Sequence, residues 1–137
     1  MPKVSIVKKF KFDSAHCLPN HEGMCQRLHG HSYVLEIGIE GYPQKSGAET
    51  GMVMDFGNLK QIVNREVIDK LDHRLINETI ENPTAENMAI WIWETLMFDA
   101  HLKGISKITL WETPSSRACL NVKGMLSILS SKIEKGE

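Results

Sequence analysis

The chain has 137 residues, of which 42% are hydrophobic and 24% are charged, and its formal net charge is −1. This length and composition are those of an ordinary globular protein with one core, so we expect a single domain over residues 1–137. The near-neutral charge gives no electrostatic reason to expect nucleic acid as a partner. The apolar runs are too short to cross a bilayer and the N-terminus lacks the core of a signal peptide. We therefore expect a cytoplasmic protein without a membrane partner.

Two long β-strands are predicted in the first third of the chain. From Lys3 to Cys17, and more cleanly from His29 to Gly41, hydrophobic and polar side chains alternate. The segment from Pro19 to Gly23 breaks the chain between them. Residues Tyr42 to Gly51 are rich in turn formers and predict a loop. A short strand is predicted after it, from Met52 to Phe56.

Two helices and two further strands are predicted in the remainder. The first helix runs from about Asn58 to Leu71, where apolar residues recur near the 3.6 period. The second begins after the N-cap Thr84 and ends near Lys103-Gly104, because Gly is a usual stop signal. Strands are then expected at Ile105–Thr113 and Ala118–Gly124.

The order strand, strand, helix, helix, strand, strand predicts the fold class. We expect an α+β fold in which an antiparallel four-stranded sheet has the two helices on one face. Such a sheet leaves two edges open, and an open edge invites pairing with another chain. Assembly into a homo-oligomer through sheet edges is therefore predicted.

Three histidines indicate a metal site. His29 and His31 are two apart on one predicted strand, so their side chains point the same way at a Cα separation of about 6.5–7 Å. His16 lies near the end of the preceding strand. Three imidazoles leave one position of a tetrahedral zinc ion open for water or substrate, which is the arrangement of a catalytic zinc. We therefore expect a Zn²⁺ enzyme, although imidazole also suits other transition metals.

The other cysteines and histidines carry weaker signals. Cys25 is either a fourth ligand that closes a structural zinc site or a reactive thiolate beside the metal. His21 is a rival ligand, ranked lower because it falls in a predicted loop, and His101 is expected to be structural near a helix C-terminus. Cys17 and Cys119 are expected to be small buried hydrophobes. An odd number of cysteines, three, also fits a reducing compartment.

Three acidic or basic side chains could act on a substrate. Asp72 and His73 follow the first predicted helix, and they are either a polar helix end or a pair in which the carboxylate orients a proton-transferring imidazole. Glu112 lies in an otherwise apolar strand, so it is either exposed or a polar group in a pocket. One use for such a carboxylate is bidentate recognition of a flat ring edge rich in N–H groups.

Taken together, these residues resemble the 6-pyruvoyl-tetrahydropterin synthase and 6-carboxytetrahydropterin synthase family. The resemblance covers nearly the whole chain and rests on short blocks in a specific order. They are Phe12–His16, Cys25 with His29-Gly30-His31, Gly51–Phe56, Leu71–His73, Leu75–Asn77, Pro83–Asn87 and Glu112-Thr113. The resemblance implies the tunnelling fold, in which sheets of several subunits join edge to edge into a barrel, and a hexamer of two trimers.

The resemblance also implies a reaction. The three residues between Cys25 and His29 match the bacterial carboxytetrahydropterin synthases, because the animal pyruvoyl synthases carry a longer insert there. That enzyme makes 6-carboxy-5,6,7,8-tetrahydropterin, acetaldehyde and triphosphate from 7,8-dihydroneopterin triphosphate in the queuosine pathway. The alternatives are the pyruvoyl synthase, a related lyase that shortens the dihydroneopterin side chain, and a pterin-binding zinc protein without turnover.

The implied roles transfer residue by residue. Zinc would be held by three imidazoles, those of His16, His29 and His31. Cys25 would be the proton acceptor, and Asp72 with His73 would relay or return protons on the other side of the substrate. Glu112 would anchor the pterin ring and share in the relay. Thr84 and Glu86 also match a family block, but Thr84 is explained as a helix cap, and both are left out of the catalytic set.

Overall fold

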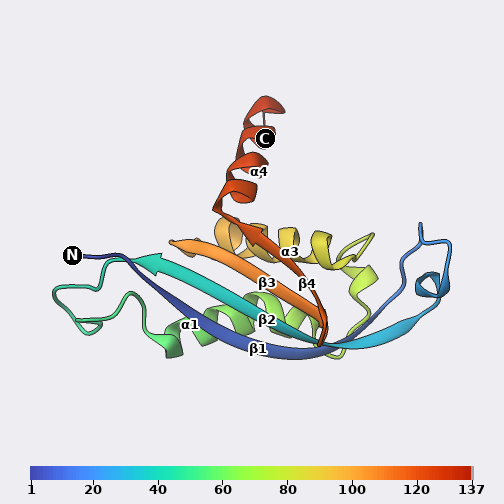
Figure 1. Ribbon diagram of the computed structural model, residues 1–137, viewed down its shortest axis with the longest axis horizontal. Coiled ribbons are helices and arrows are strands. Elements are labelled where there is room, and N and C mark those ends of the chain that lie inside the picture. The colour runs from blue at the N-terminus through green and yellow to red at the C-terminus, as the bar shows by residue number, and fades with distance from the viewer. Residues whose placement is uncertain (137) are drawn as a thin grey trace.

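The computed structural model describes residues 1–136 and contains a four-stranded antiparallel sheet in the order β1-β2-β3-β4 (Figure 1). A long hairpin and a shorter one form it, with the strands β1 (Val4–His16), β2 (His29–Gly41), β3 (Ile105–Thr113) and β4 (Ser116–Asn121). The first hairpin pairs along its full length, so that His16 lies opposite His29 and Ser14 opposite His31. The predicted sheet is confirmed, and its register already brings the three histidines to one end of the hairpin.

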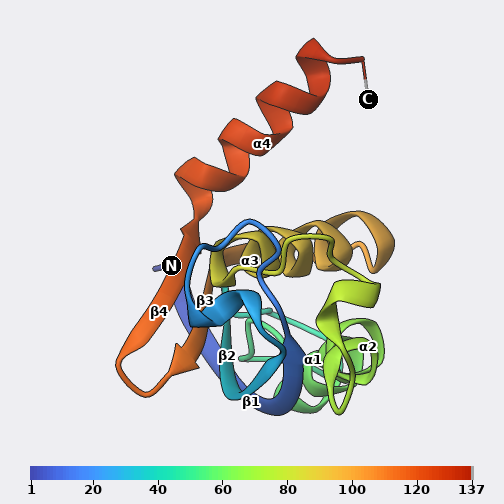
Figure 2. The ribbon, with the colours of Figure 1, turned by 90° about the vertical axis from the view of Figure 1, so that its right-hand side faces the viewer.

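Two helical segments cover one face of the sheet, as predicted (Figure 2). The first combines α1 (Phe56–Val63), a π-helical turn (Asn64–Ile68) and α2 (Asp69–Leu71), and the second combines α3 (Ala85–Glu94) with a π-helical turn (Thr95–Asp99). Short 3-10 turns occur at Met24–Gln26 and Ile76–Glu78. None of the helices within residues 1–136 is long and apolar enough to cross a membrane.

The core lies between these helices and the sheet. The alternating residues of β1 and β2 point their apolar side chains at the helices, as the sequence predicted. The largest side chains that are almost fully buried there are Tyr33, Leu35, Ile37, Leu59, Leu71, Ile76, Met88, Ile92, Leu96, Ile108 and Leu110. His16 is buried with them, so the histidine end of the hairpin is continuous with the core.

The predicted strand from Met52 to Phe56 is wrong. Residues 52–55 form no strand, with a bend at Val53 and Met54, and Phe56 is the first residue of α1. The Asp55 carboxylate accepts a hydrogen bond from the Asn58 backbone N–H at 3.0 Å, which is the N-cap that starts the helix. The alternation of apolar residues in this short run is therefore overridden by the cap.

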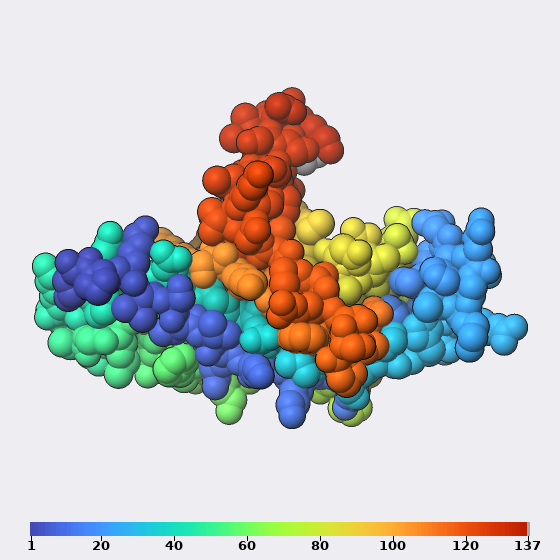
Figure 3. All heavy atoms as spheres, viewed as in Figure 1, coloured from blue at the N-terminus to red at the C-terminus, as the bar shows by residue number. Residues whose placement is uncertain are grey.

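The predicted strand from Ala118 to Gly124 is also wrong at its end. β4 stops at Asn121, whose side chain accepts a hydrogen bond from the Gly124 backbone N–H at 3.1 Å. This cap starts α4 (Val122–Glu134), a helix that we did not predict and that projects from the body of the protein (Figures 1 and 3). The second predicted helix ends at Asp99 rather than near Lys103-Gly104.

Candidate active site

Three imidazoles converge where β1 ends and β2 begins. The rings of His16, His29 and His31 have centroids 4.6–5.1 Å apart, and their planes are inclined to one another by 68–89°. One nitrogen from each lies within 4.8 Å of the others, close enough to hold one metal ion. Within residues 1–136 no other group of His, Cys, Asp and Glu has this geometry. The predicted convergence of the three histidines is confirmed.

Backbone carbonyls fix the orientation of two of these rings. His16 Nδ1 donates to the Pro83 carbonyl oxygen at 2.8 Å, and His29 Nδ1 donates to that of Arg27 at 2.7 Å. The two Nε2 atoms, 3.0 Å apart, are thereby left as acceptors for a metal. Burial lowers the pKa of His16, which favours the neutral imidazole that a metal requires. Because carbonyls of the main chain supply these contacts, no residue type in the sequence signals them.

Glu112 lies beside the histidines rather than at an exposed edge. Its carboxylate is 3.9 Å from His31 Nε2, and only 27% of its side chain is exposed. It also lines a hollow of about 490 Å³ together with Thr84, Glu86 and Arg117. Of the two readings of Glu112, the structure therefore supports a polar group in a pocket, next to the metal-binding end of the hairpin.

Asp72 and His73 form an oriented pair. The Asp72 carboxylate accepts a hydrogen bond from the Asp13 N–H at 2.9 Å and lies 3.0 Å from His73 Nδ1. His73 has φ 57°, a left-handed conformation uncommon outside glycine, and its own N–H donates to the Asp13 carbonyl oxygen. Its imidazole is largely exposed, and the residue lines a shallow hollow with His31 and Arg74. The pair is thus held rigidly at its base while the imidazole faces solvent.

A pH experiment tests this carboxylate. The Asp13 N–H, and to a smaller extent His73, lower the pKa of Asp72 below its usual value. Because the folded-state pKa is the lower one, the carboxylate stabilises the fold above about pH 4, and this contribution is lost as the pH falls through the folded-state pKa. We expect Asp72→Asn to lower the melting temperature at pH 7, with a gap that narrows as the pH is lowered below about 4. Asp69→Asn is the control, and a gap that persists at low pH would contradict the carboxylate's role.

Cys25 stands apart from the three imidazoles. It lies in the 3-10 turn of the loop between β1 and β2, half-buried, and its carbonyl accepts the Leu18 N–H at 2.8 Å. Its sulfur is not part of the metal-capable cluster found within residues 1–136. Cys17 is half-buried, but Cys119 is exposed on β4, so its prediction as a buried hydrophobe is wrong. Every second residue of β4 faces away from the core, and Cys119 is one of these.

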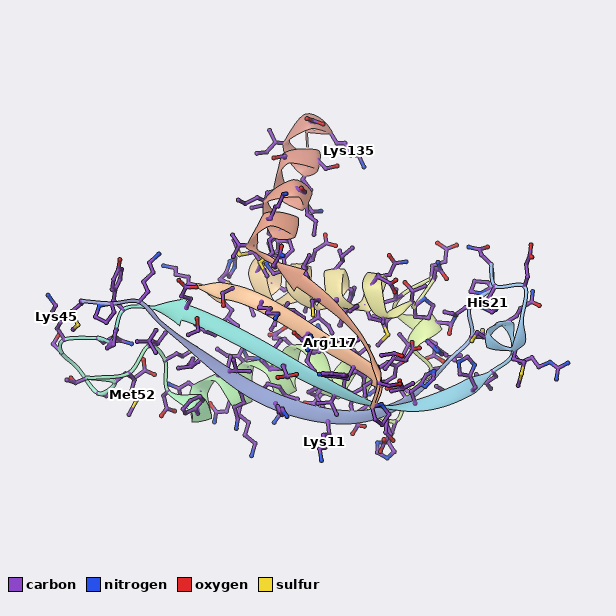
Figure 4. The ribbon with its side chains drawn as sticks, in the orientation of Figure 1. Lys11, His21, Lys45, Met52, Arg117 and Lys135 are labelled. Atoms are coloured by element: carbon purple, nitrogen blue, oxygen red, sulfur yellow. The ribbon has the colours of Figure 1, made fainter. Side chains whose placement is uncertain are left out.

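The two remaining histidines lie outside the cluster. His21 is exposed in the loop at the outer end of the long hairpin (Figure 4) and does not reach the three imidazoles. His101 is exposed just after the π-helical turn that ends at Asp99, in a left-handed conformation with φ 53°. These positions agree with the lower rank of His21 as a ligand and with the expectation that His101 lies near a helix C-terminus.

The chain is similar to known proteins over most of its length. Residues 5–122 match the family model described as 6-pyruvoyl tetrahydropterin synthase. The chain is 41% identical over 133 residues to the 6-carboxy-5,6,7,8-tetrahydropterin synthase of Haemophilus influenzae, covering 81% of this chain and 94% of that protein. It is 40% identical over 114 residues to the dihydroneopterin monophosphate aldolase of Pyrococcus furiosus, covering 80% and 90%.

A solved structure shows the same fold. The 6-pyruvoyl tetrahydropterin synthase of Caenorhabditis elegans superimposes with a TM-score of 0.76 at 28% identity, covering 88% of this chain and 96% of that one. The chain therefore belongs to the 6-pyruvoyl tetrahydropterin synthase family and has its tunnelling fold.

Proposed function

We propose that the chain is a cytoplasmic, zinc-dependent 6-carboxytetrahydropterin synthase. It would convert 7,8-dihydroneopterin triphosphate and water to 6-carboxy-5,6,7,8-tetrahydropterin, acetaldehyde and triphosphate. The convergence of three imidazoles, with the Glu112 carboxylate 3.9 Å from one of them, carries the proposal. The name of the Haemophilus influenzae relative supports the choice of product.

The donor set fits zinc. Three nitrogen ligands leave a fourth position open, and two of the rings are held by carbonyl oxygens of the main chain, as ligand imidazoles usually are. Bound zinc supplies Lewis acidity to the hydroxyls of the substrate side chain, and it makes them and the adjacent C–H more acidic.

The chain's own side chains would move the protons. Cys25 accepts a proton from the substrate as a thiolate. On the opposite side of the substrate, His73 donates or returns a proton while Asp72, 3.0 Å from its Nδ1, holds the ring in place. Glu112 binds the N–H edge of the pterin. From the family resemblance, we also propose that the complete site forms between subunits of a homo-oligomer, a hexamer of two trimers.

A related reaction is the second candidate. The 40% identity to an aldolase of dihydroneopterin monophosphate favours a lyase that only shortens the side chain. Such an enzyme would release a two-carbon aldehyde that keeps its phosphate. A pyruvoyl synthase would instead release triphosphate without cleaving a carbon–carbon bond.

Product analysis separates these reactions. Zinc-loaded protein is incubated with 7,8-dihydroneopterin triphosphate, and aldehydes, pterins and triphosphate are quantified. We expect acetaldehyde and 6-carboxytetrahydropterin in equal amounts. A pyruvoyl pterin without acetaldehyde, or a phosphorylated aldehyde, would reassign the reaction within the family, and zinc binding without turnover on any of these substrates would overturn the proposal of a lyase.

A further inference from the structure

The C-terminal helix α4 has more apolar side chains than its contacts within the same chain bury. One side packs on the body of the protein, where Met125 is buried and Ile128 and Leu129 are half-buried. On the same side Lys132 pairs with Glu94 of α3 at 3.1 Å. This side accounts for the position of the helix against α3.

A second apolar stripe on α4 is exposed. Val122, Leu126 and Ile133 are 48%, 57% and 77% exposed, and their spacing of four and seven residues puts them on one side of a helix. Ser127 lies on the polar side. No residue within 1–136 covers the stripe, and Figure 3 shows the helix standing clear of the body. The match to the family model ends at residue 122, where the helix begins.

A second exposed apolar surface lies at the opposite edge of the sheet. At the N-terminal end of β1, Val4, Met52 and Phe56 are 41%, 43% and 50% exposed. They line a hollow of about 320 Å³ that also includes Val53 and Asp55. Figure 4 places Met52 in the loop beside this end of β1, far from α4 of the same chain. The hollow is large enough for an aliphatic side chain or two.

The strand directions bring these two surfaces together between copies. β1 and β4 are the edge strands, and three successive antiparallel pairings make them run in opposite directions. When β1 of a second copy extends the sheet antiparallel to β4, its N-terminal end lies on the side where β4 runs into α4, whatever the register. The hollow of the second copy then approaches the exposed stripe of the first.

Pairing between the edge strands β4 and β1 alone would bury little surface area. β4 has six residues, whereas stable interfaces bury about 1,200–2,000 Å² in total. Apolar burial by a neighbouring helix would supply the remainder. The two surfaces also carry opposite charges, since Lys123 is exposed on α4 and Asp55 lines the hollow.

We propose that Val122, Leu126 and Ile133 of α4 dock in the hollow around Met52 of the neighbouring copy. The helix thereby clamps the edge contact between β4 and the neighbour's β1. This inference rests on the homo-oligomer proposed above and not on the identity of the substrate.

Two charge substitutions and their combination test the clamp by sedimentation velocity. Leu126→Asp and Met52→Lys each remove an apolar contact, so we expect each to weaken assembly by about tenfold or more. The double variant should recover assembly, because the two new charges attract. Ser127→Asp adds the same charge on the polar side of α4 and should assemble like the wild type. Circular dichroism and zinc content verify that each variant is folded.

The other outcomes overturn the clamp in distinguishable ways. Disruption by Leu126→Asp alone, with Met52→Lys unaffected, would mean that α4 binds something else, such as a second α4. Intact assembly in both single variants would mean that α4 contacts only its own subunit and does not hold a neighbouring copy. A monomeric wild type would refute the assembly itself. Turnover of the pterin substrate tests the proposed reaction and does not decide whether α4 docks on a neighbouring copy.

Discussion

His29→Ala is expected to lose bound zinc and to lower turnover by more than about 100-fold. Disturbing the groups behind a ligand already costs about 10–100-fold, and this change removes the ligand. His29 is a better choice than His16, because His16 is fully buried and its loss would also disturb the core. Zinc per chain is measured by mass spectrometry of the metal, and turnover is measured on 7,8-dihydroneopterin triphosphate.

The matched control is His21→Ala. His21 lies exposed in the neighbouring loop, and its imidazole Nδ1 accepts a hydrogen bond from the Gly23 N–H at 2.8 Å. We expect one zinc per chain and undiminished turnover in this variant. If His21→Ala lost zinc while His29→Ala kept it, the three-imidazole site would be wrong.

Cys25→Ala is expected to keep zinc and to lose about 10²- to 10⁴-fold in turnover, the usual contribution of a proton-transferring group. The physical reason is the position of the Cys25 thiol. The thiol lies outside the metal-capable cluster, on the loop that leads into the ligand strand β2. Zinc content and the rate constant are measured on the same preparation, so that loss of metal cannot be mistaken for loss of catalysis.

Cys17→Ala is the control for that experiment. Cys17 follows β1 directly, and its backbone groups, not its thiol, bond to the Asn77 side chain. This variant should retain both zinc and turnover. Loss of zinc in Cys25→Ala would instead make Cys25 a fourth ligand, and the proposed proton acceptor would have to be sought elsewhere.

The hairpin and its metal-binding end could be predicted because a strand's periodicity is local. Alternation alone put His29 and His31 on one face, and the pairing of two long strands placed His16 opposite His29. The carbonyl oxygens of Pro83 and Arg27 that orient two rings could not be predicted, because they belong to the main chain and depend on tertiary packing.

Helices α1, α3 and α4 begin with the same type of N-cap hydrogen bond, but the sequence did not predict their starts equally well. Thr84, Asp55 and Asn121 each accept a hydrogen bond from a backbone N–H three residues later. Only Thr84 was assigned, because a long run with helical periodicity follows it. After Asn121, the β-branched Val122 and the early Gly124 resemble a strand and its stop. The cap decides that segment, and the prediction missed α4.

The sequence alone could not decide whether three candidate catalytic residues, Asp72, His73 and Glu112, belong to a site. The sequence left each with two readings, since a polar helix end and an exposed strand position look the same as a site residue. The structure separates the readings through contacts distant in sequence, such as Asp13 to Asp72 and His31 to Glu112. Burial and partners across the sheet, not residue type, carry that information.

X-ray absorption at the zinc edge of the purified, assembled protein tests the central claim most directly. The account predicts three imidazole nitrogens at about 2.0–2.1 Å, one further light atom and no sulfur, with an unchanged spectrum in Cys25→Ala. A sulfur neighbour at about 2.3 Å that disappears in Cys25→Ala would contradict it, because zinc would then have four protein ligands and no position open for substrate.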